Sequence, residues 1–80
     1  MHYVYLIRSI SHHEFTYIGN TVNLYQRLDI HNSGGSIHTR QNRPWEIIMF
    51  MGFKDKLKAT AFEKYLKSGS GNAFAKKRFW

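Results

Sequence analysis

The feature that most constrains this chain is a short segment, residues 3–8, that is apolar on both of its sides. Alternation along a strand places Tyr3, Tyr5 and Ile7 on one face and Val4 and Leu6 on the other. Because neighbouring side chains of a strand point to opposite faces, both faces of this strand need cover, as in the centre of a sheet. A chain of 80 residues has room for one domain, which we expect to span residues 1–80. The segment therefore predicts one small sheet covered by helices.

Two further strands are indicated by apolar runs that lie between polar or turn-forming residues. Residues 15–19 follow a polar hairpin loop, and Gly19 at the end of this run permits a bend or the close approach of another group. Residues 45–53 follow Pro44 and are rich in Ile, Met and Phe. With the segment 3–8, these runs predict a three-stranded, mostly antiparallel sheet.

Helical spacing and capping residues predict three helices. Thr21 is expected to cap a helix over residues 22–32, which ends at Gly34. Asp55 is expected to cap a second helix, and a short last helix is expected from about residue 72 to residue 79. The apolar stripe expected on the second helix consists of Leu57, Ala61, Phe62, Tyr65 and Leu66. The element order β-β-α-β-α-α places the chain in the α+β class.

Composition supplies a core and excludes several kinds of site. Six Phe, five Tyr and two Trp can fill a small interior. The absence of Cys excludes disulfides, Cys-containing zinc sites and thiol catalysis. No run approaches the ~18 apolar residues of a membrane span, and the first residues lack the pattern of a signal peptide. We expect a soluble, cytoplasmic protein without membrane association, and a monomer ahead of an oligomer.

The charge favours a polyanionic partner. The net charge is +7, and residues 54–80 contribute +6 of it, with eight Lys and Arg against Asp55 and Glu63. Such a basic domain favours nucleic acid first and an anionic membrane surface second, although a solvated basic face explains the same charge. The bases of this segment are Lys54, Lys56, Lys58, Lys64, Lys67, Lys76, Lys77 and Arg78.

A few side chains suit chemistry on an anion, each with a structural alternative. Arg27 and His31 are four residues apart and are neighbours on a helix, where they suit anion binding and proton transfer or merely border the core. Tyr5 and Tyr17 take equivalent positions on two paired strands and either contact substrate or fill the core. Glu63 suits a divalent cation, or it pairs with Lys67 one helical turn away.

Several short motifs follow one another over nearly the whole chain. They are Tyr3-Val4-Tyr5, Tyr17-Ile18-Gly19, Thr21-x-x-Leu24-x-x-Arg27-Leu28-x-x-His31-Asn32, Thr39, Arg43-Pro44-Trp45 and Phe62-Glu63-Lys64-Tyr65-Leu66-Lys67-Ser68-Gly69-Ser70-Gly71. Their order resembles the GIY-YIG nuclease superfamily. The small, single-domain bacterial members resemble the chain most closely, and Tyr3 replaces the first glycine of the family name.

The resemblance implies a three-stranded antiparallel sheet flanked by helices and Mg²⁺-dependent hydrolysis of a nucleic-acid phosphodiester. Mn²⁺ is the expected substitute ion, and DNA is expected ahead of RNA. By position, Tyr5 would help to deprotonate the attacking water beside Tyr17, Arg27 would contact the scissile phosphate, His31 would assist proton transfer, and Glu63 would hold the metal. The substrate-binding residues expected around them are Arg8, Gly19, Asn72 and Lys67, and capping of the last helix explains Asn72 equally well.

The expected mechanism has one demanding step. At neutral pH, ionising a phenol with a pKa of ~10 costs about 4 kcal/mol, so Arg8, the metal or His31 as proton acceptor must lower that cost. These groups are expected to converge around one phosphate-sized hollow, which requires Glu63 and Arg27 to lie on the same side of the sheet. The alternatives are a nucleic-acid-binding module on the same fold that cleaves nothing and a basic protein that binds acidic partners.

Overall fold

The computed structural model describes all of residues 1–80. The elements in chain order are β1 (His2–Ser9), β2 (Thr16–Thr21), α1 (Leu24–Ser33), the 3-10 helix η1 (Arg40–Asn42), β3 (Trp45–Phe53), α2 (Lys56–Leu66) and α3 (Gly69–Arg78). The predicted α+β class and the order β-β-α-β-α-α are therefore confirmed. The expected range of the third strand, residues 45–53, matches β3. None of the helices has the length and apolar character that crossing a membrane demands.

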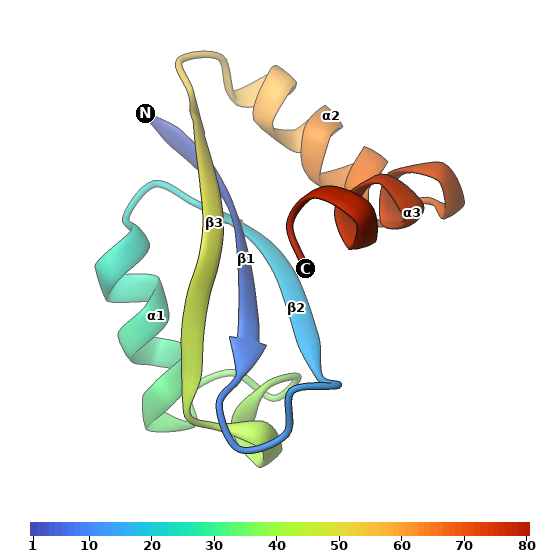
Figure 1. The fold of residues 1–80 in the computed structure, drawn as a ribbon. Helices are drawn as coiled ribbons and strands as arrows, with labels where there is room; N and C mark the ends of the chain where they lie inside the picture. The colour runs from blue at the N-terminus through green and yellow to red at the C-terminus, as the bar shows by residue number, and fades with distance from the viewer.

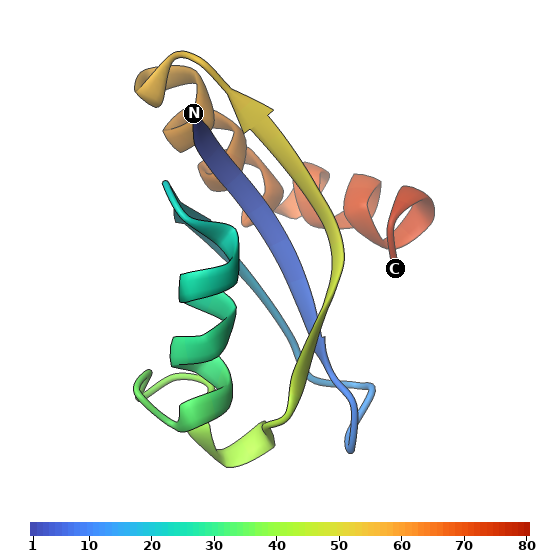
Figure 2. The same cartoon turned by 90° about the vertical axis from the view of Figure 1, so that its left-hand side faces the viewer.

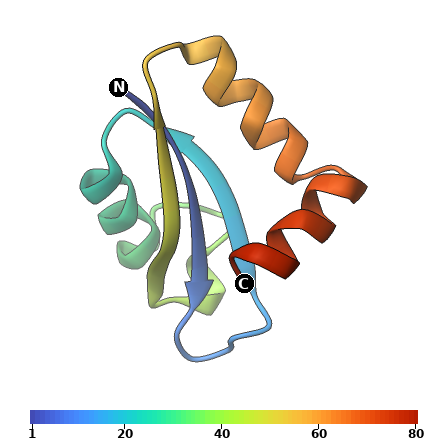
Figure 3. The ribbon, with the colours of Figure 1, turned by 45° about the horizontal axis from the view of Figure 1, so that its top comes forward.

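The three strands form one antiparallel sheet in the order β2-β1-β3, so the strand that is apolar on both sides lies in the middle. Helix α1 covers one face of the sheet, and α2 and α3 cover the other (Figures 1 and 3). Seen from the side of α1, this helix lies in front of the strands and the other two helices lie behind them (Figure 2). Strand β2 is an outer strand, and its far edge has no partner.

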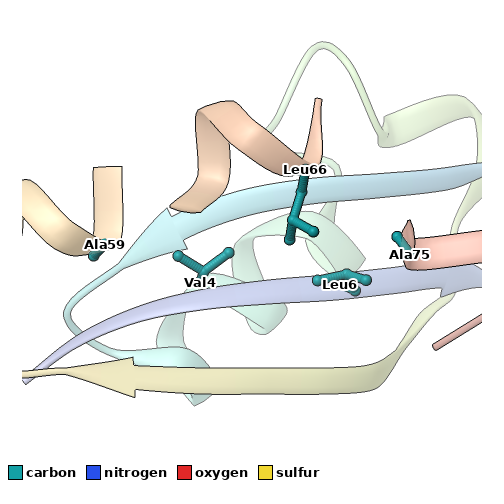
Figure 4. Close-up of a cluster of buried hydrophobic side chains, with 5 residues drawn as sticks. All are labelled: Val4, Leu6, Ala59, Leu66 and Ala75. Carbon is teal, nitrogen blue, oxygen red and sulfur yellow. The ribbon is translucent and has the colours of Figure 1, made fainter. Parts of the chain in front are cut away.

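Each face of β1 contributes to its own apolar cluster. Val4 and Leu6 pack under α2 and α3, where they meet Ala59, Leu66 and Ala75 (Figure 4). On the α1 face, Tyr5 and Ile7 pack with Trp45, and Leu24 and Leu28 of α1 cover them. Residues 4–7 are all buried, which confirms that this segment needs cover on both faces.

The start of the first helix differs from the sequence prediction. Asn23 is the N-cap, since its side chain accepts a hydrogen bond from the backbone N–H of Gln26, and the helix begins at Leu24. Thr21 pairs with Tyr3 as the last residue of β2, which runs two residues beyond the expected end. Both residues are good caps; strand pairing decides between them. The helix ends as predicted at Gly34, which adopts the left-handed conformation with φ 85°.

The last two helices correct two further predictions. Asp55 caps α2 as expected, but the side of this helix that faces the sheet carries Ala59, Phe62 and Leu66. Leu57, Ala61 and Tyr65 of the predicted stripe are exposed. Helix α3 begins three residues earlier than expected, because Ser68 caps it by accepting a hydrogen bond from the N–H of Gly71. Asn72 therefore lies within the helix and does not cap it.

Candidate active site

The hydroxyl of Tyr5 is the centre of a polar cluster between β1 and α1. It lies 2.8 Å from Nε2 of His31, and it accepts a 3.3 Å hydrogen bond from Nε of Arg27. Arg27 and His31 lie one turn apart on α1, so the same helix presents both groups to the hydroxyl. The structure therefore brings these three predicted side chains together. His31 is fully buried, deeper than the border of the core where its helical spacing put it.

Gly19 makes room for the Tyr5 hydroxyl. It pairs directly with Tyr5 across the two strands, and a Cβ built on it would overlap the hydroxyl and the ring of Tyr5. Strand β2 continues with regular pairing through Gly19 to Thr21, so of the two expectations for this glycine the close approach of another group is confirmed and the bend is not. Because Gly19 has no side chain, the phenol of Tyr5 can lie over the outer strand β2, towards the open edge of the sheet.

Tyr17 lies beside the cluster and not opposite Tyr5. The register pairs Tyr17 with Ile7, so the two tyrosines are diagonal neighbours on the α1 face instead of equivalent partners. The ring of Tyr17 contacts the ring of His31 edge-on, with their centroids 5.2 Å apart. Tyr17 therefore holds one side of the buried imidazole.

Two residues that the sequence reasoning gave no role complete the surroundings of His31. Oγ1 of Thr39 lies 2.7 Å from Nδ1 of His31, and both side chains are fully buried. The indole N–H of Trp45 donates a 2.8 Å hydrogen bond to the carbonyl of Thr39, which holds the loop in place. Both residues belong to the motifs that carry the family resemblance, and this was the only sign in the sequence that they matter. The contact between Thr39 and His31 could not be predicted, because Thr39 lies beyond the end of α1 and no helical or strand spacing links it to His31.

Burial and the guanidinium control ionisation in this cluster. The pKa of Tyr5 is raised above its ordinary value, first by burial and then by the charges of Tyr17 and Glu63, against the lowering effect of Arg27. The pKa of His31 is lowered to about 4 by burial and by the positive charge of Arg27. The hydrogen bond to Tyr5 raises the pKa of Arg27. At neutral pH the cluster therefore holds a phenol, a neutral imidazole and one positive charge, which favours an anion.

These shifts oppose the proton relay expected from the sequence. In the free protein, the proton donor Tyr5 has a pKa above 10, whereas the proton acceptor His31 has a pKa of about 4. That difference costs about 8 kcal/mol or more. The imidazole is therefore a poor acceptor until a bound anion offsets the charge of Arg27, which is one of the two causes of its low pKa.

Glu63 approaches this cluster from the other side of the sheet. Its helix, α2, packs on the face opposite α1, so Glu63 and Arg27 do not share a face as the sequence interpretation required (Figure 3). Glu63 lies on the sheet-facing side of α2, between the turns of the buried Ala59 and Leu66, and only 21% of its side chain is exposed. Its negative charge still raises the pKa of Tyr5.

Lys67 shows how the two faces are connected. Its ammonium group lies 2.9 Å from the Glu63 carboxylate and 5.9 Å from the ring centre of Tyr17, which belongs to the α1 face. Because β2 is the outer strand, this connection passes round its open edge. The cluster and the carboxylate are thus linked through Lys67 at an edge of the sheet, and no enclosed pocket surrounds them. This open edge replaces the hollow that we expected.

The donor set near the edge fits only a weakly held cation. Nowhere in the chain do three or more His, Asp or Glu side chains gather as a metal cluster. Glu63 offers a carboxylate, the kind of oxygen ligand that Mg²⁺ takes one or two of while it keeps water in its other positions. A single half-buried carboxylate fits this mode, once Lys67 releases it.

Two of the predicted substrate-binding residues lie away from the cluster. Arg8 shares a face with Leu6, opposite to Tyr5, and its guanidinium lies 4.0 Å from the carboxylate of Glu46. Arg8 therefore does not ease the ionisation of Tyr5, contrary to the sequence reasoning. Asn72 is exposed in the first turn of α3, and its side chain forms no hydrogen bond within the chain.

Comparison with known proteins gives a consistent picture. The family model described as the GIY-YIG catalytic domain matches residues 1–78. The structure-specific endonuclease subunit SLX1 of Podospora anserina is 41% identical over 66 residues, which cover 75% of this chain and 19% of that protein. The SLX1 subunit of Candida glabrata is 35% identical over 79 residues, covering 90% of this chain and 25% of that protein.

A bacterial relative matches over a larger share of its own length. A UPF0213 protein of Clostridium perfringens is 36% identical over 73 residues, which cover 90% of this chain and 76% of that protein. The chain spans a quarter or less of the two SLX1 subunits. The family match extends over nearly all of the fold described above, including both sides of the Tyr5 cluster. The chain therefore belongs to the GIY-YIG catalytic domain family.

Proposed function

We propose that this chain is an endonuclease domain that hydrolyses phosphodiester bonds of nucleic acid, with DNA preferred to RNA. The observation that carries the proposal is the Tyr5 hydroxyl held between the guanidinium of Arg27 and the imidazole of His31, at an open edge of the sheet. The SLX1 relatives are structure-specific endonuclease subunits, which supports the activity, and the net charge of +7 supports the class of substrate.

In this reaction Arg27 binds the scissile phosphate, and its charge stabilises the added negative charge of the transition state. Tyr5 accepts a proton from the attacking water while it passes its own hydroxyl proton to Nε2 of His31. The water oxygen forms a bond to phosphorus, the bond to the leaving oxygen breaks, and the leaving oxygen takes up a proton from the imidazolium or from solvent. The phosphate pairs with Arg27, so it weakens one cause of the low pKa of His31 as the proton arrives.

Glu63 is the residue that would hold a Mg²⁺ or Mn²⁺ ion, which supplies charge neutralisation at the phosphate and the leaving oxygen when it is bound. The carboxylate of Glu63 lies near the edge of β2, and its negative charge already raises the pKa of Tyr5. Lys67 would then be free to contact a neighbouring phosphate of the substrate.

A cleavage assay tests the proposal. Single-stranded, duplex and branched DNA and RNA are incubated with the protein and Mg²⁺ or Mn²⁺, with EDTA as the metal-free control. Cleavage should require the metal and should be lost in Glu63→Gln, whereas Glu14→Gln, in the exposed β1–β2 loop, should cleave normally. Binding without cleavage across the whole panel would refute the nuclease and leave a nucleic-acid-binding module.

A further inference from the structure

A line of four hydrogen-bonding groups runs from the surface of α1 into the core: Arg27, Tyr5, His31 and Thr39. We infer that Thr39 holds His31 in the tautomer with the ring proton on Nδ1 by accepting that proton, and so keeps Nε2 free to accept the hydroxyl proton of Tyr5. Thr39 is thus a positioning residue, which acts on the reaction through His31. Its catalytic meaning rests on the proposed function, but the tautomer itself does not.

The direction of the line follows from its first member. A guanidinium only donates hydrogen bonds, so Nε–H of Arg27 uses the oxygen of Tyr5 as acceptor. The hydroxyl proton of Tyr5 has Nε2 of His31, 2.8 Å away, as its one acceptor within hydrogen-bond distance. A neutral imidazole has one N–H and one acceptor nitrogen. If Nε2 accepts, Nδ1 carries the proton and donates it to Oγ1 of Thr39 at 2.7 Å.

The opposite arrangement pairs these groups less well. There, Thr39 would donate to Nδ1, and Nε2–H would become a second donor to a phenol oxygen that already accepts from Arg27. The proton left without an acceptor would then be that of Tyr5 instead of that of Thr39. A phenol is a stronger acid than an aliphatic hydroxyl and a poorer acceptor. The better pairing therefore sends the phenol proton to the imidazole and the imidazole proton to the threonine.

Thr39 is the one hydrogen-bond partner of Nδ1 of His31. The imidazole is fully buried, so water does not satisfy this nitrogen, and the edges of Tyr5 and Tyr17 hold the ring from its sides. Thr39 is itself anchored through its carbonyl, which accepts the indole N–H of Trp45. During the proposed reaction, the oxygen of Thr39 also stabilises the imidazolium that forms when Tyr5 passes on its proton.

Nitrogen-15 NMR of the imidazole ring tests the inference on the free protein at pH 7. The wild type and Thr39→Ser, which keeps the hydroxyl, should show a protonated Nδ1 and an unprotonated Nε2. Thr39→Val, which has the same shape without the acceptor, should shift the ring towards the Nε2–H tautomer. In the cleavage assay, Thr39→Val should lose roughly 10-fold to 100-fold in kcat with little change in KM, and Thr39→Ser should restore most of it.

Thr60→Val is the matched control, because Thr60 is exposed on α2 and its hydroxyl bonds only to the carbonyl of Lys56. A wild-type ring protonated on Nε2 would overturn the inference, as would Thr39→Val with an unchanged tautomer and unchanged kcat. If Thr39→Val does not fold, Thr39→Ala, which also lacks the hydroxyl, is read in the same way. An inactive wild type would overturn the proposed function alone, because the tautomer is read without substrate.

Discussion

Substitution of Gly19 is the most direct way to displace the Tyr5 hydroxyl without replacing any hydrogen-bonding side chain of the cluster. In Gly19→Ala, the new methyl group would lie 2.8 Å from Cε1 of Tyr5 and nearer still to Cζ and the hydroxyl. Carbon atoms in contact normally lie about 3.5–4.0 Å apart, so the phenol must move by about 1 Å. The backbone at Gly19 does not have a positive φ, so the substitution adds no backbone strain.

The size of the effect follows from what that movement breaks. The hydrogen bond from Arg27 to Tyr5 is already 3.3 Å long and would open beyond bonding range, and the 2.8 Å contact with His31 would weaken. Overpacking in a filled core costs about 1–3 kcal/mol, and each weakened hydrogen bond about 0.5–1.5 kcal/mol. We expect a free energy of unfolding lower by about 2–6 kcal/mol and a kcat lower by about 100-fold, as for other misplacements of 1 Å.

Urea titration and the cleavage assay measure the two quantities on the same preparation. Gly69→Ala is the matched control, since a methyl group there meets nothing within 4 Å, and it should change neither quantity. If Gly19→Ala were as active and as stable as the wild type, the hydroxyl position inferred from the structure would be wrong. Loss of stability with full activity would instead show that the contacts of the hydroxyl do not contribute to cleavage.

Three other perturbations probe the same edge of the sheet. Tyr5→Phe should lower kcat by about 10²-fold to 10⁴-fold with nearly unchanged DNA affinity in a binding titration, and an active variant would exclude Tyr5 from the mechanism. Because the pKa of His31 falls from 6.5 to about 4 on folding, the unfolded chain binds a proton there below pH 6.5 while the folded chain does not, and acidification from pH 6.5 to pH 4 should remove about 3 kcal/mol of stability. Urea titrations at several pH values should show this loss in the wild type but not in His31→Gln. Lys67→Met should tighten Mn²⁺ binding about 2-fold to 5-fold by calorimetry, because the competing cation on Glu63 is gone; unchanged or weaker binding would argue against Glu63 as the ligand.

Local sequence was sufficient where a residue acts through its own backbone or its immediate neighbours. The segment 3–8 had to be central because both of its sides are apolar, and β1 is central. Asp55 and Gly34 mark the start of α2 and the end of α1 as predicted, since capping and the left-handed conformation depend on a few adjacent residues. The motif order was likewise enough to identify the family before any contact was known.

Tertiary structure decided which of several chemically similar residues is used. Helix α2 has apolar residues on more than one side, and only packing on the sheet selects Ala59 and Leu66 over Leu57. The contact between Thr39 and His31 closes a loop, and no helical or strand period predicts it. The low pKa of His31 has the same origin, because desolvation exists only once β1, α1 and the loop have closed around the ring. Short-range periodicity describes one element at a time, whereas burial is a property of all of them together.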